Sequence, residues 1–96
     1  MAVLFLTRFT TDPDQAEEML AARAALIAAV RDRCSGLTEA RLSKLDEGTW
    51  LDVWRWDSRA SMQAALDAAP TIPEAAAAFS ATSGATRETA DVVDER

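Results

Sequence analysis

The chain alternates between segments with hydrophobic residues at every second position and segments with hydrophobic residues three and four positions apart. Residues 2–10 (AVLFLTRFT) and 49–57 (TWLDVWRWD) are apolar on both alternating faces, a pattern typical of central strands covered on both sides. Residues 37–45 and the segment from Ser83 also follow the period of a strand, but they carry charged side chains. We expect these two to be edge strands, because charges discourage unwanted pairing at an edge.

Two helical regions separate the strands. Asp12 is expected to cap a helix that runs to about Arg33. The second region is predicted to be broken into a helix capped by Ser58 and a further helix whose capping box pairs Thr71 with Glu74. The resulting order, β-α-β-β-α-β, predicts an α+β fold, a ferredoxin-like sandwich in which a four-stranded antiparallel sheet carries both helical regions on one face.

Helices on one face leave the other face of the sheet uncovered. In the third strand, Leu51 and Val53 lie on the opposite face from Trp50, Trp54 and Trp56. An exposed apolar sheet face requires a cover, and a two-fold contact between identical sheets would bury both copies at once. We therefore expect a homodimer formed through this sheet face.

Composition excludes several classes of partner. The 96 residues are expected to form one domain, residues 1–96, with 10 scattered Lys and Arg against 16 Asp and Glu. The net charge of -6 argues against binding to nucleic acid or to anionic lipid, and no apolar run approaches the roughly 18 residues of a membrane span. The single cysteine, Cys34, fits a reducing compartment, so the cytoplasm is the expected location. Without histidine, no metal site is expected.

Two short motifs carry a family resemblance. Gly36-Leu37 opens the second predicted strand, and Trp56-Asp57-Ser58 ends the third before the helical stretch RASMQAAL. With its element order and length, the chain resembles the antibiotic biosynthesis monooxygenase family of dimeric α/β-barrel proteins. The resemblance implies a pocket between sheet and helices in each subunit. It also implies oxygenase chemistry without a cofactor, in which Trp56 and a polar first-strand residue, here Thr7, take part.

The chain departs from the family pattern at two points. Active members carry an amide where this chain has Thr7, and a threonine hydroxyl offers only one donor. The haem-degrading branch uses an axial histidine, and the chain contains none. We therefore expect neither haem nor any other cofactor.

Asp52 is the candidate base, since it alternates with Trp50 and Trp54 on one strand face. Desolvation among indoles would make its carboxylate better suited to general-base work. The sequence favours the simpler interpretation, an ion pair between Asp52 and Arg41 or Arg8 on a neighbouring strand.

The tryptophans are expected mainly to build the wall between sheet and helices, because each ring buries on the order of 150 to 250 Å². A pocket in that wall would be lined by Trp54, Trp50, Met62, Leu66 and Phe79. If these side chains pack closely against one another, no pocket remains.

Two functions stay open. One is a cofactor-independent monooxygenase that acts on an aromatic or phenolic small molecule, with Asp52, Trp56 and Thr7 as its catalytic residues. The alternative is a non-catalytic homodimeric barrel that binds a small apolar ligand or has a purely structural role. An oxygenase requires an open cavity on the order of several hundred Å³ with polar groups converging on it.

Overall fold

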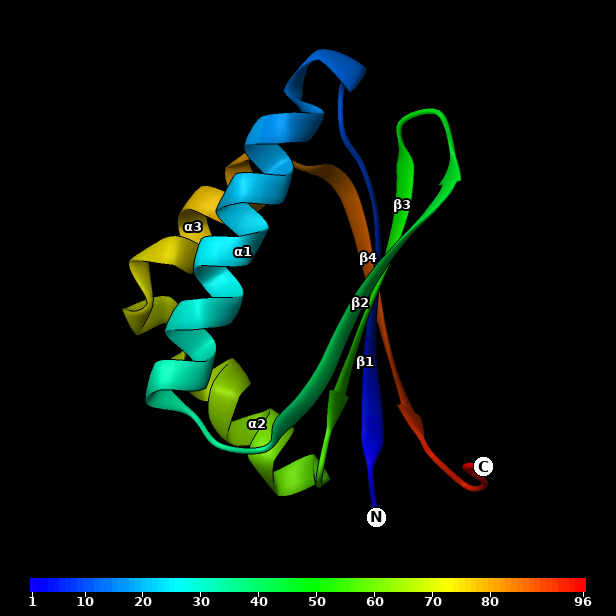
Figure 1. Cartoon of the computed structure of the whole chain (residues 1–96). Helices are drawn as coiled ribbons and strands as arrows, with labels where there is room; N and C mark the ends of the chain where they lie inside the picture. The colour runs from blue at the N-terminus through cyan, green and yellow to red at the C-terminus, as the bar shows by residue number, and fades with distance from the viewer.

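Four strands form one antiparallel sheet, and every helix lies on the same side of it (Figure 1). The structure is a computed structural model that describes all residues from 1 to 96. The strands are β1 (Val3–Thr10), β2 (Leu37–Asp46), β3 (Thr49–Trp56) and β4 (Ser83–Asp91), in the spatial order β2-β3-β1-β4. The ferredoxin-like arrangement is therefore confirmed, with the two most apolar strands at the centre and the charged strands at the edges.

The helical layer contains α1 (Ala16–Arg33), α2 (Arg59–Ala68) and α3 (Pro73–Ser80). A short 3₁₀ turn, Pro13–Gln15, leads into α1, and a second, Ala69–Thr71, separates α2 from α3. In Figure 1, α1 runs along most of the length of the sheet with α3 beside it, while α2 lies at the lower end. None of the helices is long and apolar enough to cross a membrane.

Two predicted caps are present and one is not. The Asp12 side chain accepts a hydrogen bond from the Asp14 amide at 3.0 Å, and the Ser58 hydroxyl accepts one from the Ser61 amide at 3.1 Å. The predicted Thr71–Glu74 capping box is wrong. The Thr71 hydroxyl instead donates to the Ala68 carbonyl at 2.7 Å and so closes the preceding turn, and α3 begins without a side-chain cap.

The core lies between the helical layer and the facing side of the sheet. Trp56 is 3% exposed and belongs to a buried cluster whose members come from β1, β3, α1, α2 and the residue between the second 3₁₀ turn and α3. The cluster consists of Val3, Val30, Trp56, Met62, Ala65 and Ile72. Its position between the layers leaves the opposite face of the sheet without any helical cover (Figure 1).

Strand register decides which side chains face the helices. Across β1 and β3 the residue opposite Trp56 is Val3, and the pairs that follow on the same face put Phe5 opposite Trp54 and Thr7 opposite Asp52. Intervening residues point to the other face. That outer face has a half-buried apolar centre made by Leu4, Leu6, Leu51 and Val53.

The link between α1 and β2 is held by a close backbone approach at Gly36. This residue has a φ of 102°, and its carbonyl accepts a hydrogen bond from the Asp57 amide at 2.8 Å. A Cβ at Gly36 would lie 2.6 Å from the Asp57 carboxylate and from the Ser61 side chain. Only glycine fits here, so the Gly-Leu motif ties the start of β2 to the start of α2.

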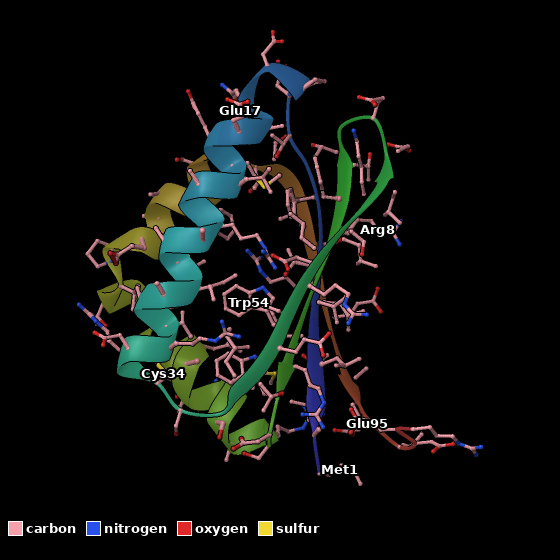
Figure 2. All side chains as sticks on the ribbon, viewed as in Figure 1. Met1, Arg8, Glu17, Cys34, Trp54 and Glu95 are labelled. Carbon is pink, nitrogen blue, oxygen red and sulfur yellow. The ribbon has the colours of Figure 1, made fainter.

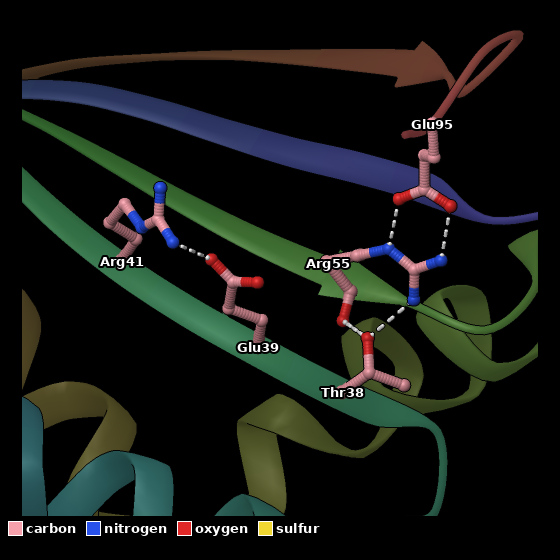
Figure 3. A network of polar contacts seen from close by, with 5 residues as sticks. All are labelled: Thr38, Glu39, Arg41, Arg55 and Glu95. Carbon is pink, nitrogen blue, oxygen red and sulfur yellow. Dashed lines mark hydrogen bonds and ion pairs between the residues drawn. The ribbon is translucent and has the colours of Figure 1, made fainter.

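The C-terminal segment is fastened to the sheet by an arginine of β3 (Figure 3). Arg55 donates from Nε and Nη2 to the two carboxylate oxygens of Glu95, each at 2.6 Å. Its Nη1 donates to the Thr38 hydroxyl at 2.8 Å, which keeps the guanidinium in position. The hydrogen bonds from Arg55 hold the pKa of the Glu95 carboxyl below its ordinary value of 4.5.

We expect the C-terminal segment to detach as the solution becomes acidic. Because the pKa of Glu95 is depressed by Arg55, the contact is complete above the ordinary pKa of 4.5 and is lost as pH falls through the lower folded value. Backbone amide NMR of residues 92–96 should report increasing mobility over that window. Glu95→Gln should give the mobile spectrum at neutral pH. Glu47→Gln, which breaks only the exposed pair with Lys44, should not; a mobile tail in this control would contradict the assignment.

Candidate functional site

A cavity of about 200 Å³ lies between the helix-facing side of the sheet and the helical layer. Of its 21 lining residues 16 are hydrophobic, so the space suits an apolar, ring-shaped molecule better than a polar one. The aromatic and sulfur-containing part of the wall is made by Phe5, Met19, Trp54, Trp56, Met62 and Phe79. The predicted wall of side chains therefore encloses open space and is not closed by its own packing, although this space is smaller than the several hundred Å³ expected for an oxygenase.

A row of polar residues crosses this apolar wall. Thr7 on β1 lies opposite Asp52 on one neighbouring strand and opposite Arg87 on the other. All three line the cavity, and residues that pair directly across adjacent strands point to the same face. Since neighbouring strands lie about 4.8 Å apart, the row extends roughly 10 Å across the floor of the cavity.

Asp52 is held by three hydrogen bonds. Arg23 on α1 donates from Nε to Oδ2 at 2.9 Å and from Nη2 to Oδ1 at 3.0 Å, and the Trp54 indole Nε1 donates to Oδ1 at 3.0 Å. The side chains of Arg23 and Asp52 are only 18% and 12% exposed. Figure 2 shows Trp54 pointing into the space between the sheet and α1, where it lines the cavity.

The ion pair predicted for Asp52 exists, but its predicted partners are wrong. Arg41 and Arg8 lie opposite Val53 and Leu51, on the outer face of the sheet, and Figure 2 shows Arg8 on the side away from the helices. The true partner, Arg23, comes from α1. A signal for it was available, because Arg23 interrupts the apolar helical stripe that contains Met19 and Val30. A charge in a buried stripe requires a buried partner.

The Asp52 carboxylate can accept one more hydrogen bond. An ionised carboxylate has about four lone-pair sites, and Arg23 and Trp54 occupy three of them. The remaining site belongs to Oδ2, which receives a single hydrogen bond. One further donor, such as a ligand hydroxyl, can bind there without displacing a protein group.

All but one of the other residues singled out from the sequence line the cavity. Along with Asp52, the cavity wall includes Thr7, Trp54, Trp56, Met62, Leu66 and Phe79. Trp50 is the exception, because it lies towards the hairpin end of β3, where Lys44 Nζ is 5.6 Å from its ring centroid. The hydroxyl of Thr7 has no hydrogen-bond partner within the protein.

Exposed lining residues mark the mouth of the cavity. The side of Phe79 and Leu66 is open to solvent, with these residues 54% and 39% exposed. The guanidinium carbon of Arg87 lies 4.6 Å from the centre of the Phe79 ring. Neither Arg23 nor Arg87 was singled out from the sequence as a site residue.

No group of three or more His, Cys, Asp or Glu side chains is placed so that it could hold a metal ion.

Comparison with known proteins gives matches to one family model and to solved structures. The model described as "antibiotic biosynthesis monooxygenase" matches residues 2–82. SnoaB, a cofactor-independent oxygenase from Streptomyces nogalater, is 20% identical with a TM-score of 0.73, and the alignment covers 98% of this chain and 95% of that one. A comparison with curated proteins finds no significant match.

Two further solved structures are similar over most of their length. A candidate antibiotic biosynthesis monooxygenase from Caulobacter crescentus CB15 is 20% identical, with a TM-score of 0.79 and coverage of 97% of this chain and 91% of that one. A dimeric ferredoxin-like protein of unknown function from Thermobifida fusca is 16% identical, with a TM-score of 0.70 and coverage of 96% and 92%. At these identities the structural matches establish the fold.

The ion pair in the cavity wall should make a large contribution to stability. Arg23→Met would leave the Asp52 carboxylate buried without its cation, and we expect a loss of about 3 kcal/mol in the free energy of unfolding. Adding Asp52→Leu should restore most of that loss, because no buried charge then remains. Urea unfolding of the single and double variants measures both effects.

Arg41→Met is the matched control for this prediction. Arg41 pairs with Glu39 on the outer face, and its side chain is 72% exposed, so the loss should stay within about 0.5 kcal/mol. Equal destabilisation by Arg23→Met and Arg41→Met would contradict the assigned role of the Arg23–Asp52 pair.

Proposed function

Because the chain belongs to the antibiotic biosynthesis monooxygenase family, we propose that it is a cofactor-independent monooxygenase that acts on an aromatic or phenolic small molecule. The observation that carries the proposal is the row of polar side chains on the floor of an otherwise apolar cavity. Such a site can desolvate a ring and orient a hydroxyl group at the same time.

The proposed chemistry uses the substrate itself as the source of electrons. A phenol that loses its proton becomes electron-rich enough to react with dioxygen. In the overall conversion of a phenol to a quinone, one oxygen atom enters the ring and the other leaves as water. The substrate supplies all four electrons, so the protein needs to provide only positioning, exclusion of water and a route for protons.

The cavity supplies these three contributions. We assign to Asp52 the role of accepting the substrate hydroxyl at its free Oδ2 site and drawing its proton away. The Thr7 hydroxyl, which has no protein partner, is assigned to donate a hydrogen bond to the oxygen that develops negative charge. Trp56 forms the inner wall against which the ring is held, and Trp54 keeps Asp52 in position.

The outer face of the sheet carries a separate proposal about assembly. We propose a homodimer formed through the outer face of the sheet, whose apolar centre has no helical cover. The charges around that centre have both signs, with Arg8 and Arg41 near Glu39 and Glu88, so a two-fold contact can pair them. The dimeric ferredoxin-like relative from Thermobifida fusca supports this assembly.

The catalytic assignment predicts which polar groups oxygen consumption depends on. With a panel of hydroxylated bicyclic and tricyclic aromatics, Asp52→Asn should lower kcat about 100-fold. Thr7→Val should lower it about tenfold, because one hydrogen bond is lost. The measurement is oxygen uptake together with mass analysis of the product, on variants with an unchanged circular dichroism spectrum.

Thr89→Val is the matched control, because Thr89 lies on the same face of β4 but does not line the cavity. It should leave kcat unchanged. Saturable binding of the aromatic compounds without oxygen uptake in the unmodified protein would overturn the enzymatic proposal and leave the alternative, a ligand-binding barrel.

The dimer is tested by one charge on the outer face. Val53→Glu should convert the dimer to a monomer, because two-fold symmetry would bury the new charge twice. Leu20→Glu, at a 45% exposed position on α1, should leave the dimer intact. Light scattering after size-exclusion chromatography measures the mass of each. A monomeric unmodified protein, or a dimeric Val53→Glu variant, would refute this interface.

A further inference from the structure

One of the two arginines that line the cavity has no acidic partner. Three charged residues line it: Arg23, Asp52 and Arg87. Arg23 and Asp52 form an ion pair, whereas Arg87 takes part in none of the ion pairs in the structure. Arg87 is exposed on the edge strand β4, like the other arginines that form no ion pair (Arg8, Arg31 and Arg33), but it alone of these lines the cavity. Its lack of a carboxylate partner therefore leaves the guanidinium available to a ligand.

Arg87 is fixed at the mouth of the cavity by an aromatic ring. Its guanidinium carbon lies 4.6 Å from the centre of the Phe79 ring, within the range of a cation–π contact. Such a contact uses the face of the guanidinium and leaves its edge, with five N–H donors, free. No protein group accepts a hydrogen bond from the Arg87 side chain. The edge is suited to a planar anion such as a carboxylate, which it can bind with two parallel hydrogen bonds.

The polar row gives the two ends of such a ligand different chemistry. Asp52 can accept one hydrogen bond at Oδ2, so its end of the row suits a hydroxyl donor. Arg87, two strands away, offers only donors and suits an anion. The floor between them extends roughly 10 Å, and the apolar side chains Phe5 and Trp54 lie beside it. A flat molecule with a hydroxyl at one end and an acid at the other satisfies both ends.

We propose that the cavity takes a hydroxylated aromatic carboxylic acid, with its carboxylate on Arg87 and its hydroxyl on Asp52. The inference rests on the proposed function, since it takes this cavity to be the substrate site. Arg87 is then the residue that determines specificity: it selects acids over neutral phenols, and it excludes aromatic amines in their cationic form. The same anchor orients the ring, because it fixes which end of the substrate meets Asp52 and Thr7.

The test compares one ligand with and without its charge. Binding of 6-hydroxy-2-naphthoic acid and of its methyl ester is measured by isothermal titration calorimetry under anaerobic conditions, so that no turnover interferes. The unmodified protein should bind the acid at least about tenfold more tightly than the ester. Arg87→Met should reduce this preference to less than twofold, while Arg87→Lys should keep part of it, because an ammonium retains the charge but not the planar fork.

Arg31→Met is the matched control, because Arg31 is exposed on α1, forms no ion pair and does not line the cavity. It changes the net charge equally and should leave the tenfold preference intact. Equal affinity for acid and ester in the unmodified protein would overturn the proposal. A preference that survives in Arg87→Met with an unchanged melting temperature would do so as well, and so would failure of both ligands to bind.

These outcomes are distinct from those of the monooxygenase proposal. If the acid binds through Arg87 but no compound of the aromatic panel consumes oxygen, the assignment of Arg87 stands and the oxygenase proposal fails. If neutral phenols are oxygenated as well as the acids are, the oxygenase proposal stands and the role of Arg87 fails.

Discussion

A hydrogen-bonded ion pair between Arg23 on α1 and Asp52 on β3 connects the helical layer to the sheet across an otherwise apolar space. Asp52 is buried and Arg23 is only partly exposed, so neither can be lost without leaving an uncompensated charge between the layers. The Trp54 indole adds a third hydrogen bond and is thereby fixed in the cavity wall.

The arrangement of the site follows from the alternation of side chains along β3. Asp52, Trp54 and Trp56 share the face that meets the helices, while Leu51 and Val53 face the other way. One strand thus supplies both the inner wall of the cavity and the apolar centre of the outer face. A change of register by one residue would exchange these two surfaces and would remove the cavity and the proposed dimer contact together.

Local sequence signals were sufficient to predict the fold. The two strands with apolar residues on both faces are central, and Asp12 and Ser58 cap helices where expected. The Thr71–Glu74 pattern failed because Thr71 is part of a tight turn between two helices, where its hydroxyl binds a carbonyl before it can act as a cap. A threonine hydroxyl can either cap the following helix or bind a carbonyl of the preceding turn, and the residues on both sides of the motif decide between the two.

The candidate site was less predictable, because its polar contacts join elements that are distant in sequence. Asp52 could be recognised, but its partner Arg23 lies 29 positions earlier on a helix, and pairing across neighbouring strands was the simpler expectation. Arg87 was interpreted as a charge on an edge strand, and only the register with Thr7 shows that it faces the cavity. Trp50 faces the helices opposite Phe9, yet only Phe9 of this pair lines the cavity.

The polar row from Asp52 to Arg87 is proposed to bind and orient an aromatic substrate. The most direct measurement is a crystal structure of the protein grown anaerobically with 6-hydroxy-2-naphthoic acid. The account predicts the ring in the cavity beside Trp54, the hydroxyl within hydrogen-bond distance of Asp52 Oδ2, and the carboxylate on Arg87. A ligand bound with the opposite orientation, or bound elsewhere while the cavity stays closed by its own side chains, would contradict it.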